Sequence, residues 1–74
     1  MIANAEVAKQ IVDLVLDGYR RIEQSMKLAE ETSTPEEFAN YHRAVGKVTA
    51  AILFEILEPL YEQNPKLKPA GWDD

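Results

Sequence analysis

Apolar residues recur every three or four positions along most of the chain, which is the spacing of one face of an α-helix. In the first part of the chain the pattern starts just after Asn4, a residue type that often caps helices. The apolar positions are Val7, Ala8, Ile11, Val12, Leu14, Val15, Tyr19, Ile22, Met26 and Ala29. We therefore predict a long first helix over residues 4–31.

A strong helix-start signal divides the chain after this helix. Thr34 can cap with its hydroxyl, Pro35 suits the first helical position, and Glu37 completes a capping box. The helical spacing then resumes and continues until an Asn-Pro pair stops it. These signals predict a turn at residues 32–34 and a second helix at residues 35–63.

Pro59 lies inside the second helix, where it has no N–H to donate and where its ring crowds the preceding turn. We expect a kink near Glu55 to Pro59 or an early end to the regular helix. The remaining segment, residues 64–74, contains two prolines and a glycine, and we expect it to be extended. The whole pattern predicts an all-α fold, a single antiparallel two-helix hairpin.

Both helices are more apolar than a hairpin requires. A surface helix needs an apolar stripe about 100° wide, whereas the first helix carries an arc of roughly 200°. The second helix has two stripes on the helical wheel. The first, which we expect to face the first helix, contains Phe38, Val45, Val48, Ile52, Ile56 and Leu60. The second contains Ala39, Gly46, Ala50, Phe54, Leu57 and Tyr61.

The second stripe would be left in water on a free monomer, so it predicts an interface. We expect Gly46 and Ala50 to allow close approach of another helix, and Phe54, Leu57 and Tyr61 to supply contact area. A two-fold homodimer forming a four-helix bundle is the simplest arrangement that satisfies this requirement. Other arrangements stay open: the tail could fold back and cover the stripe with Leu67 and Trp72, or the stripe could serve a larger assembly or a different protein.

The composition also favours association with another chain, because the protein has few other sources of stability. The chain has 74 residues and no cysteine, so a small core must be stabilised without disulfides or thiolate metal ligands. Its net charge of −5 and scattered basic residues argue against nucleic acid as a partner. No stretch approaches the roughly 20 apolar residues of a membrane span, and no secretory signal is evident, so we expect a cytoplasmic protein that does not bind membranes.

Polar residues between the two helices define a candidate pocket. His42, the only histidine, falls within an apolar arc where Glu23 could reach it, and Tyr19 could face Thr49. A functional interpretation is a general-base histidine held by a carboxylate. The structural interpretation, hydrogen-bonded side chains at the edge of a core, is the more common outcome for such residues.

No motif in the sequence specifies a metal or a cofactor. The di-iron carboxylate pattern pairs each histidine with a glutamate three residues earlier, and here that residue is Ala39. We therefore expect no metal and no cofactor.

The leading hypothesis is a non-enzymatic interaction or regulatory module that acts as a homodimer and presents a helical surface to another protein. The alternative is a small-molecule binder or enzyme with its pocket inside the bundle. A DNA-associated dimerisation module is a third hypothesis and would need the basic side chains to gather on one face. The segment ending in Trp72 could be a docking peptide, could pack on the bundle or could be disordered.

Overall fold

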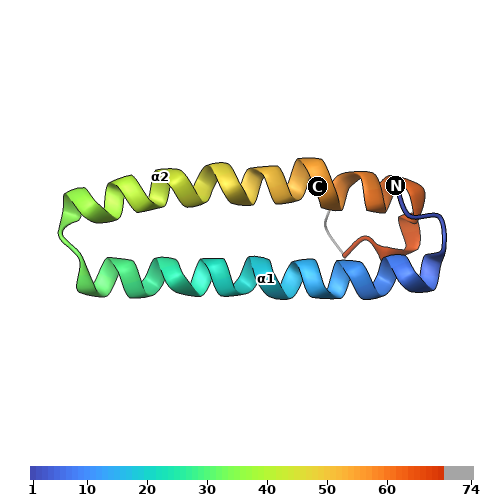
Figure 1. Cartoon of the computed structure of the whole chain (residues 1–74), viewed down its shortest axis with the longest axis horizontal. Helices are drawn as coiled ribbons and strands as arrows, with labels where there is room; N and C mark the ends of the chain where they lie inside the picture. Colours follow the sequence, from blue (N-terminus) through green and yellow to red (C-terminus); the bar gives the residue numbers. More distant parts are fainter. Residues whose placement is uncertain (70–74) are drawn as a thin grey trace.

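The computed structural model describes residues 1–69 and shows two long helical arms packed antiparallel (Figure 1). Helix α1 spans Ala5–Thr32, and helix α2 spans Pro35–Ala51. The second arm continues through η1, a π-helical segment at Ile52–Leu57, into helix α3 at Glu58–Gln63. A 3-10 turn, η2, follows at Pro65–Leu67. The described residues contain no strand, and the predicted all-α hairpin is confirmed.

Side-chain caps fix the helix starts where the sequence predicts them. The Oδ1 atom of Asn4 accepts hydrogen bonds from the backbone N–H groups of Glu6 and Val7, at 3.0 and 3.1 Å. At the turn, the Thr34 hydroxyl accepts from the N–H of Glu37, and the Glu37 carboxylate accepts from the N–H of Thr34. These hydrogen bonds favour the ionised carboxylate and lower the pKa of Glu37.

The π-helical segment η1 ends two residues before Pro59. Its widened hydrogen bonding is explicit at Glu58, whose N–H donates to the carbonyl of Leu53 five residues earlier. Proline cannot donate to a regular α-helical ladder and crowds the preceding turn. A π-helical turn is one of the known ways in which a helix absorbs such an interruption. The irregularity expected near Pro59 therefore takes the form of a π-helical segment in an otherwise continuous arm.

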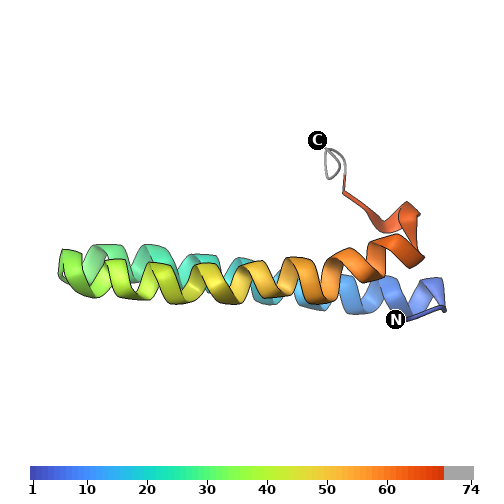
Figure 2. The same cartoon turned by 90° about the horizontal axis from the view of Figure 1, so that it is seen from above.

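The chain turns sharply at Asn64, and residues 65–69 lie outside the plane of the two arms (Figure 2). The Asn64 side chain is buried and donates through Nδ2 to the carbonyl of Ile2 at 2.9 Å. The N–H of Leu67 bonds the carbonyl of Asn64 at 3.0 Å, which closes the 3-10 turn. The prediction of a fully extended tail is therefore wrong for Pro65–Leu67, and residues 70–74, including Trp72, lie outside the described part.

The core is concentrated at the end of the hairpin that holds the N-terminus and α3. It consists of Ala8, Val12, Leu57, Leu60 and Tyr61, all 0–3% exposed. Leu67 packs against it, as the fold-back alternative expected of this residue. In the half of the hairpin near the turn between the arms, Val45 is the one hydrophobic residue of the described chain that is buried, at 8% exposed. The molecule is consequently long and thin, with extents of 45 × 21 × 19 Å.

Candidate interaction surfaces

Only part of the predicted interface stripe lies on the surface of the folded chain. Leu57 and Tyr61 are 0% exposed and belong to the hairpin's own core, so their placement on an outer surface is wrong. Phe54 is 65% exposed, Gly46 is exposed and Ala50 is half-buried. Three of the five predicted residues therefore reach the surface, and only Phe54 among them is large.

The π-helical segment explains this error. The prediction assumed an uninterrupted α-helix, in which each residue advances by about 100° around the axis. A π-helical turn takes up an extra residue, so every later side chain lags by about one residue, or roughly 100°. This rotation carries Leu57 and Tyr61 from the outer side of the arm to the side that faces α1. Burial there raises the pKa of Tyr61, and the nearby charge of Asp13 raises it further.

A different apolar surface is exposed instead, on one flank of the hairpin. We call it the Leu14–Val48 face; its exposed large side chains are Val7, Leu14 and Leu28 on α1 and Tyr41 and Val48 on α2. Leu14 is 73% exposed, and Val48, which was predicted to pack against the first helix, is 50% exposed. These residues are spaced at multiples of seven in α1 and seven apart in α2, so each set lies along one line of its helix.

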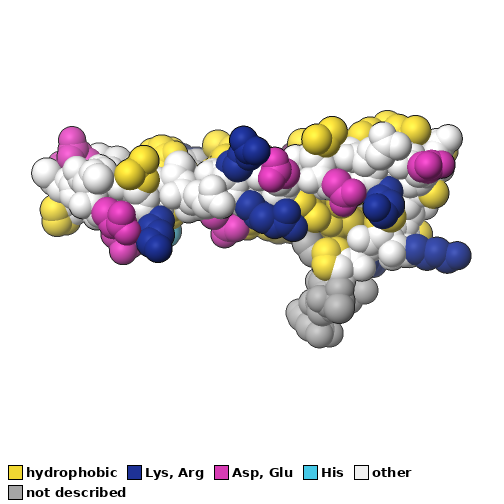
Figure 3. All heavy atoms as spheres, turned by 90° about the horizontal axis from the view of Figure 1, so that it is seen from below, with side chains coloured by type: hydrophobic (Ala, Val, Ile, Leu, Met, Phe, Trp, Pro, Cys, Tyr) yellow, Lys and Arg dark blue, Asp and Glu magenta, His cyan; other side chains and the backbone are white. Residues whose placement is uncertain are grey.

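A hydrogen bond between the arms shows that the two lines share a flank. The Ser25 hydroxyl donates to the carbonyl of Ile22 at 2.5 Å, so the Tyr41 hydroxyl donates to Ser25 across 2.6 Å. Ser25 lies beside Leu28 on α1, seven residues after Gly18. Hydrophobic side chains follow this edge of the molecule, opposite the side from which the chain leaves α3 (Figure 3). The same view shows basic side chains interspersed with acidic ones.

The sequence of α1 contains a pattern that indicates this face. Treating all of its apolar residues as one arc of roughly 200° did not separate this pattern from the core positions. Two separate three-and-four repeats run along α1, one position apart. The core repeat is Ala8, Val12, Val15, Tyr19, Ile22, Met26 and Ala29. The outer repeat is Val7, Ile11, Leu14, Gly18, Arg21, Ser25 and Leu28. A helix with two such seams is typical of a bundle in which it has two neighbours.

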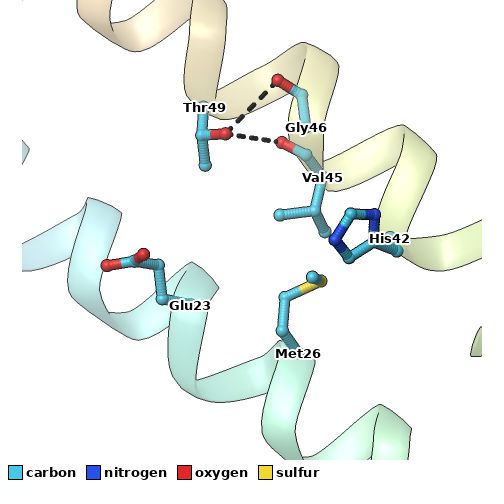
Figure 4. Close-up of a pocket in the computed structure, with 6 residues that line it drawn as sticks. All are labelled: Glu23, Met26, His42, Val45, Gly46 and Thr49. Atoms are coloured by element: carbon cyan, nitrogen blue, oxygen red, sulfur yellow. Dashed lines mark hydrogen bonds between the residues drawn. The ribbon is translucent and has the colours of Figure 1, made fainter.

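The opposite flank carries a shallow groove at the position of the predicted pocket. It has a volume of about 210 Å³ and is lined by Glu23, Met26, His42, Val45, Gly46 and Thr49 (Figure 4). Three of the four predicted pocket residues are therefore brought together. Tyr19, the fourth, is half-buried in the seam between the arms and is not among the lining residues.

The polar groups of the groove do not converge on one point. The Glu23 carboxylate points away from the His42 ring (Figure 4), and neither a hydrogen bond nor an ion pair joins the two side chains. His42 is exposed and makes an edge contact with the Phe38 ring at 5.8 Å. Thr49 donates to the carbonyls of Val45 and Gly46 in its own helix. The groove thus brings polar side chains close together without arranging them as an acid–base pair.

Within residues 1–69, no group of three or more histidine, aspartate or glutamate side chains is placed so that it could hold a metal ion. Within the same residues, no helix has the length and apolar character that crossing a bilayer requires.

Comparison with known proteins gives no relative for this chain. No protein family, no curated protein and no solved structure matches it.

Proposed function

We propose that the protein is a non-enzymatic helical interaction module whose working form is a homodimer of hairpins, arranged as a four-helix bundle. The observation that carries this proposal is the Leu14–Val48 face, a line of exposed apolar side chains along both arms. Exposed apolar surfaces of this extent on a small domain are typical of association sites.

The overall dimensions indicate that the monomer leaves more of its surface in water than a compact protein of the same size. A compact monomer of this mass, 8.4 kDa, exposes about 4,600 Å², whereas the hairpin exposes 5525 Å². Its radius of gyration is 14.7 Å, against about 11 Å for a compact chain of this length. The surplus area, roughly 900 Å², follows from the elongated shape, which leaves in water side chains that a compact fold would cover.

Molar mass in solution tests the proposal. We expect light scattering on a sizing column to give twice the 8.4 kDa chain mass at micromolar concentration, with dissociation on dilution. A monomer at every concentration up to the millimolar range would refute the homodimer. The expected cytoplasmic location stays a prediction that imaging of the tagged protein would test.

The groove supports the second candidate, a small-molecule binder, less well. Its volume of about 210 Å³ is below the range of roughly 300–1,000 Å³ typical of ligand sites. Ligand-observed NMR with a fragment library tests it. Fragments that bind the native protein and lose affinity in His42→Ala and Thr49→Val would favour this candidate.

A further inference from the structure

We propose that the two copies meet through the Leu14–Val48 face, with α1 antiparallel to α1 of the partner and Gly18 at the crossing point. This inference rests on the proposed homodimer and adds the surface and the symmetry axis. It replaces the stripe around Phe54, because folding removed Leu57 and Tyr61 from that stripe and left Phe54 as its single large exposed side chain within residues 1–69.

The position of Gly18 is the first argument. A glycine inside a helix costs about 1 kcal/mol relative to alanine, so a structural reason is expected for it. Within the hairpin there is none, since a Cβ added at Gly18 would meet nothing within 4 Å. The same is true of Gly46, but of the two only Gly18 lies in the outer repeat of α1. Gly18 lies at the middle of α1, which spans Ala5–Thr32. A glycine at the midpoint of an exposed seam lets two helix backbones approach closely there and overlap along their full length.

The outer seam of α1 is self-complementary about a point between Asp17 and Gly18, close to the middle of the helix. A two-fold axis at the level of the Asp17–Gly18 peptide makes residues equally far on either side of it neighbours across the interface. Val7 then meets Leu28, and Leu14 meets the aliphatic stem of Arg21. The Arg21 Nε remains 3.1 Å from the Asp17 carboxylate, so its charge stays paired. Apolar groups thus cover apolar groups without burying a lone charge.

The second arm fits the same axis. Because Tyr41 bonds Ser25 across the hairpin, antiparallel pairing brings Val48 level with Gly18. A two-fold axis at the level of Gly18 and Val48 places Val48 against Val48 of the second copy. Ala44 and Ala51 stand about equally far on either side of it, and these small side chains leave room for the partner's α2. Both arms therefore satisfy one symmetry operation, which favours a second copy of this chain as the occupant of the face.

Cross-linking tests the axis directly, because the native chain contains no cysteine. Under mild oxidation Gly18→Cys should form a disulfide-linked dimer as its main product, since symmetric positions beside the axis are within disulfide reach. Gly46→Cys is the matched control: it replaces another mid-helix glycine with open space around it, on the groove flank. We expect only background cross-linking from the control. Equal cross-linking of both variants would overturn the proposal.

Charged substitutions test the face independently. Leu14→Glu should raise the dimer dissociation constant at least about tenfold, because two leucines lose their apolar contacts. Phe54→Glu, at a comparably exposed site off the face, should change it less than about twofold. The outcomes separate the two proposals. A monomeric native protein refutes the homodimer and this interface together. A native dimer that Phe54→Glu dissociates and Leu14→Glu does not, or that Gly18→Cys fails to cross-link, refutes this interface alone.

Discussion

Replacing Leu57 with alanine tests the side-chain register that η1 imposes on the end of the second arm. Leu57 is fully buried, and removing a buried leucine leaves a cavity that costs about 2–5 kcal/mol. The core here is thin and can partly collapse, so we expect the lower part of that range, about 2–3 kcal/mol. For a domain of this size such a loss lowers Tm by roughly 10–20 °C.

Phe54→Ala is the matched control from the same stripe of the helical wheel. Phe54 is 65% exposed, and alanine regains about 0.5 kcal/mol in helix propensity, so the net change should stay below about 1 kcal/mol. Urea denaturation followed by circular dichroism measures both variants, at one fixed protein concentration because association contributes to stability. Equal, small effects would mean that Leu57 faces outward, and would refute the π-helical register.

The Tyr61 phenol gives a second measure of the same register. Burial and the charge of Asp13 raise its pKa above 10.0, so the alkaline absorbance titration should contain an ionisation above pH 10 that Tyr61→Phe removes. Because the folded-state pKa is the higher one, the contribution to stability is complete below pH 10 and is lost as the pH rises through the folded-state pKa. If the ionisation that Tyr61→Phe removes lay at or below pH 10, the burial of Tyr61 would be contradicted.

Other contacts give further predictions. Asn64→Asp replaces the amide donor that bonds Ile2 with an acceptor, and should lower the unfolding free energy by about 1–3 kcal/mol, whereas an unchanged urea midpoint would contradict this role. A double-mutant cycle of Ser25→Ala and Tyr41→Phe should give a coupling of about 0.5–1 kcal/mol, and strict additivity would show that the interhelical hydrogen bond contributes nothing. The lowered pKa of Glu37 implies stability that is present above pH 4.5 and is lost as the pH falls through the folded-state pKa, so Glu37→Gln should flatten the acid limb of the stability profile.

Local signals were sufficient to predict both arms and the turn between them. Asn4 and Thr34 each cap a helix through hydrogen bonds to residues two or three positions away, so neither depends on distant parts of the chain. An antiparallel hairpin also fixes which levels of the two arms face each other. For this reason Glu23, His42 and Thr49 were predicted to lie close together, and the groove contains all three.

The sequence could not predict how the side chains of Glu23, His42 and Thr49 are oriented in the groove. The Glu23 carboxylate and the His42 ring both lie near enough to the surface to be solvated, and water competes with a contact between them. Spacing along a helix gives only the level and the approximate side of a residue. It does not decide between a hydrogen bond across the groove and two separately hydrated groups.

The sequence by itself determined the helices, their ends and the excess of apolar surface, because these follow from residue type and from contacts within a few positions. Only the tertiary structure decided which apolar stripe the hairpin covers. The Leu14–Val48 face stays in water because it points away from the contact between the two arms. The π-helical segment before Pro59 rotates the following residues by about one position, which brings Leu57 and Tyr61 into the core. That rotation depends on how a proline is accommodated while the end of the arm packs against α1 and Leu67, a balance between distant segments that no local pattern records.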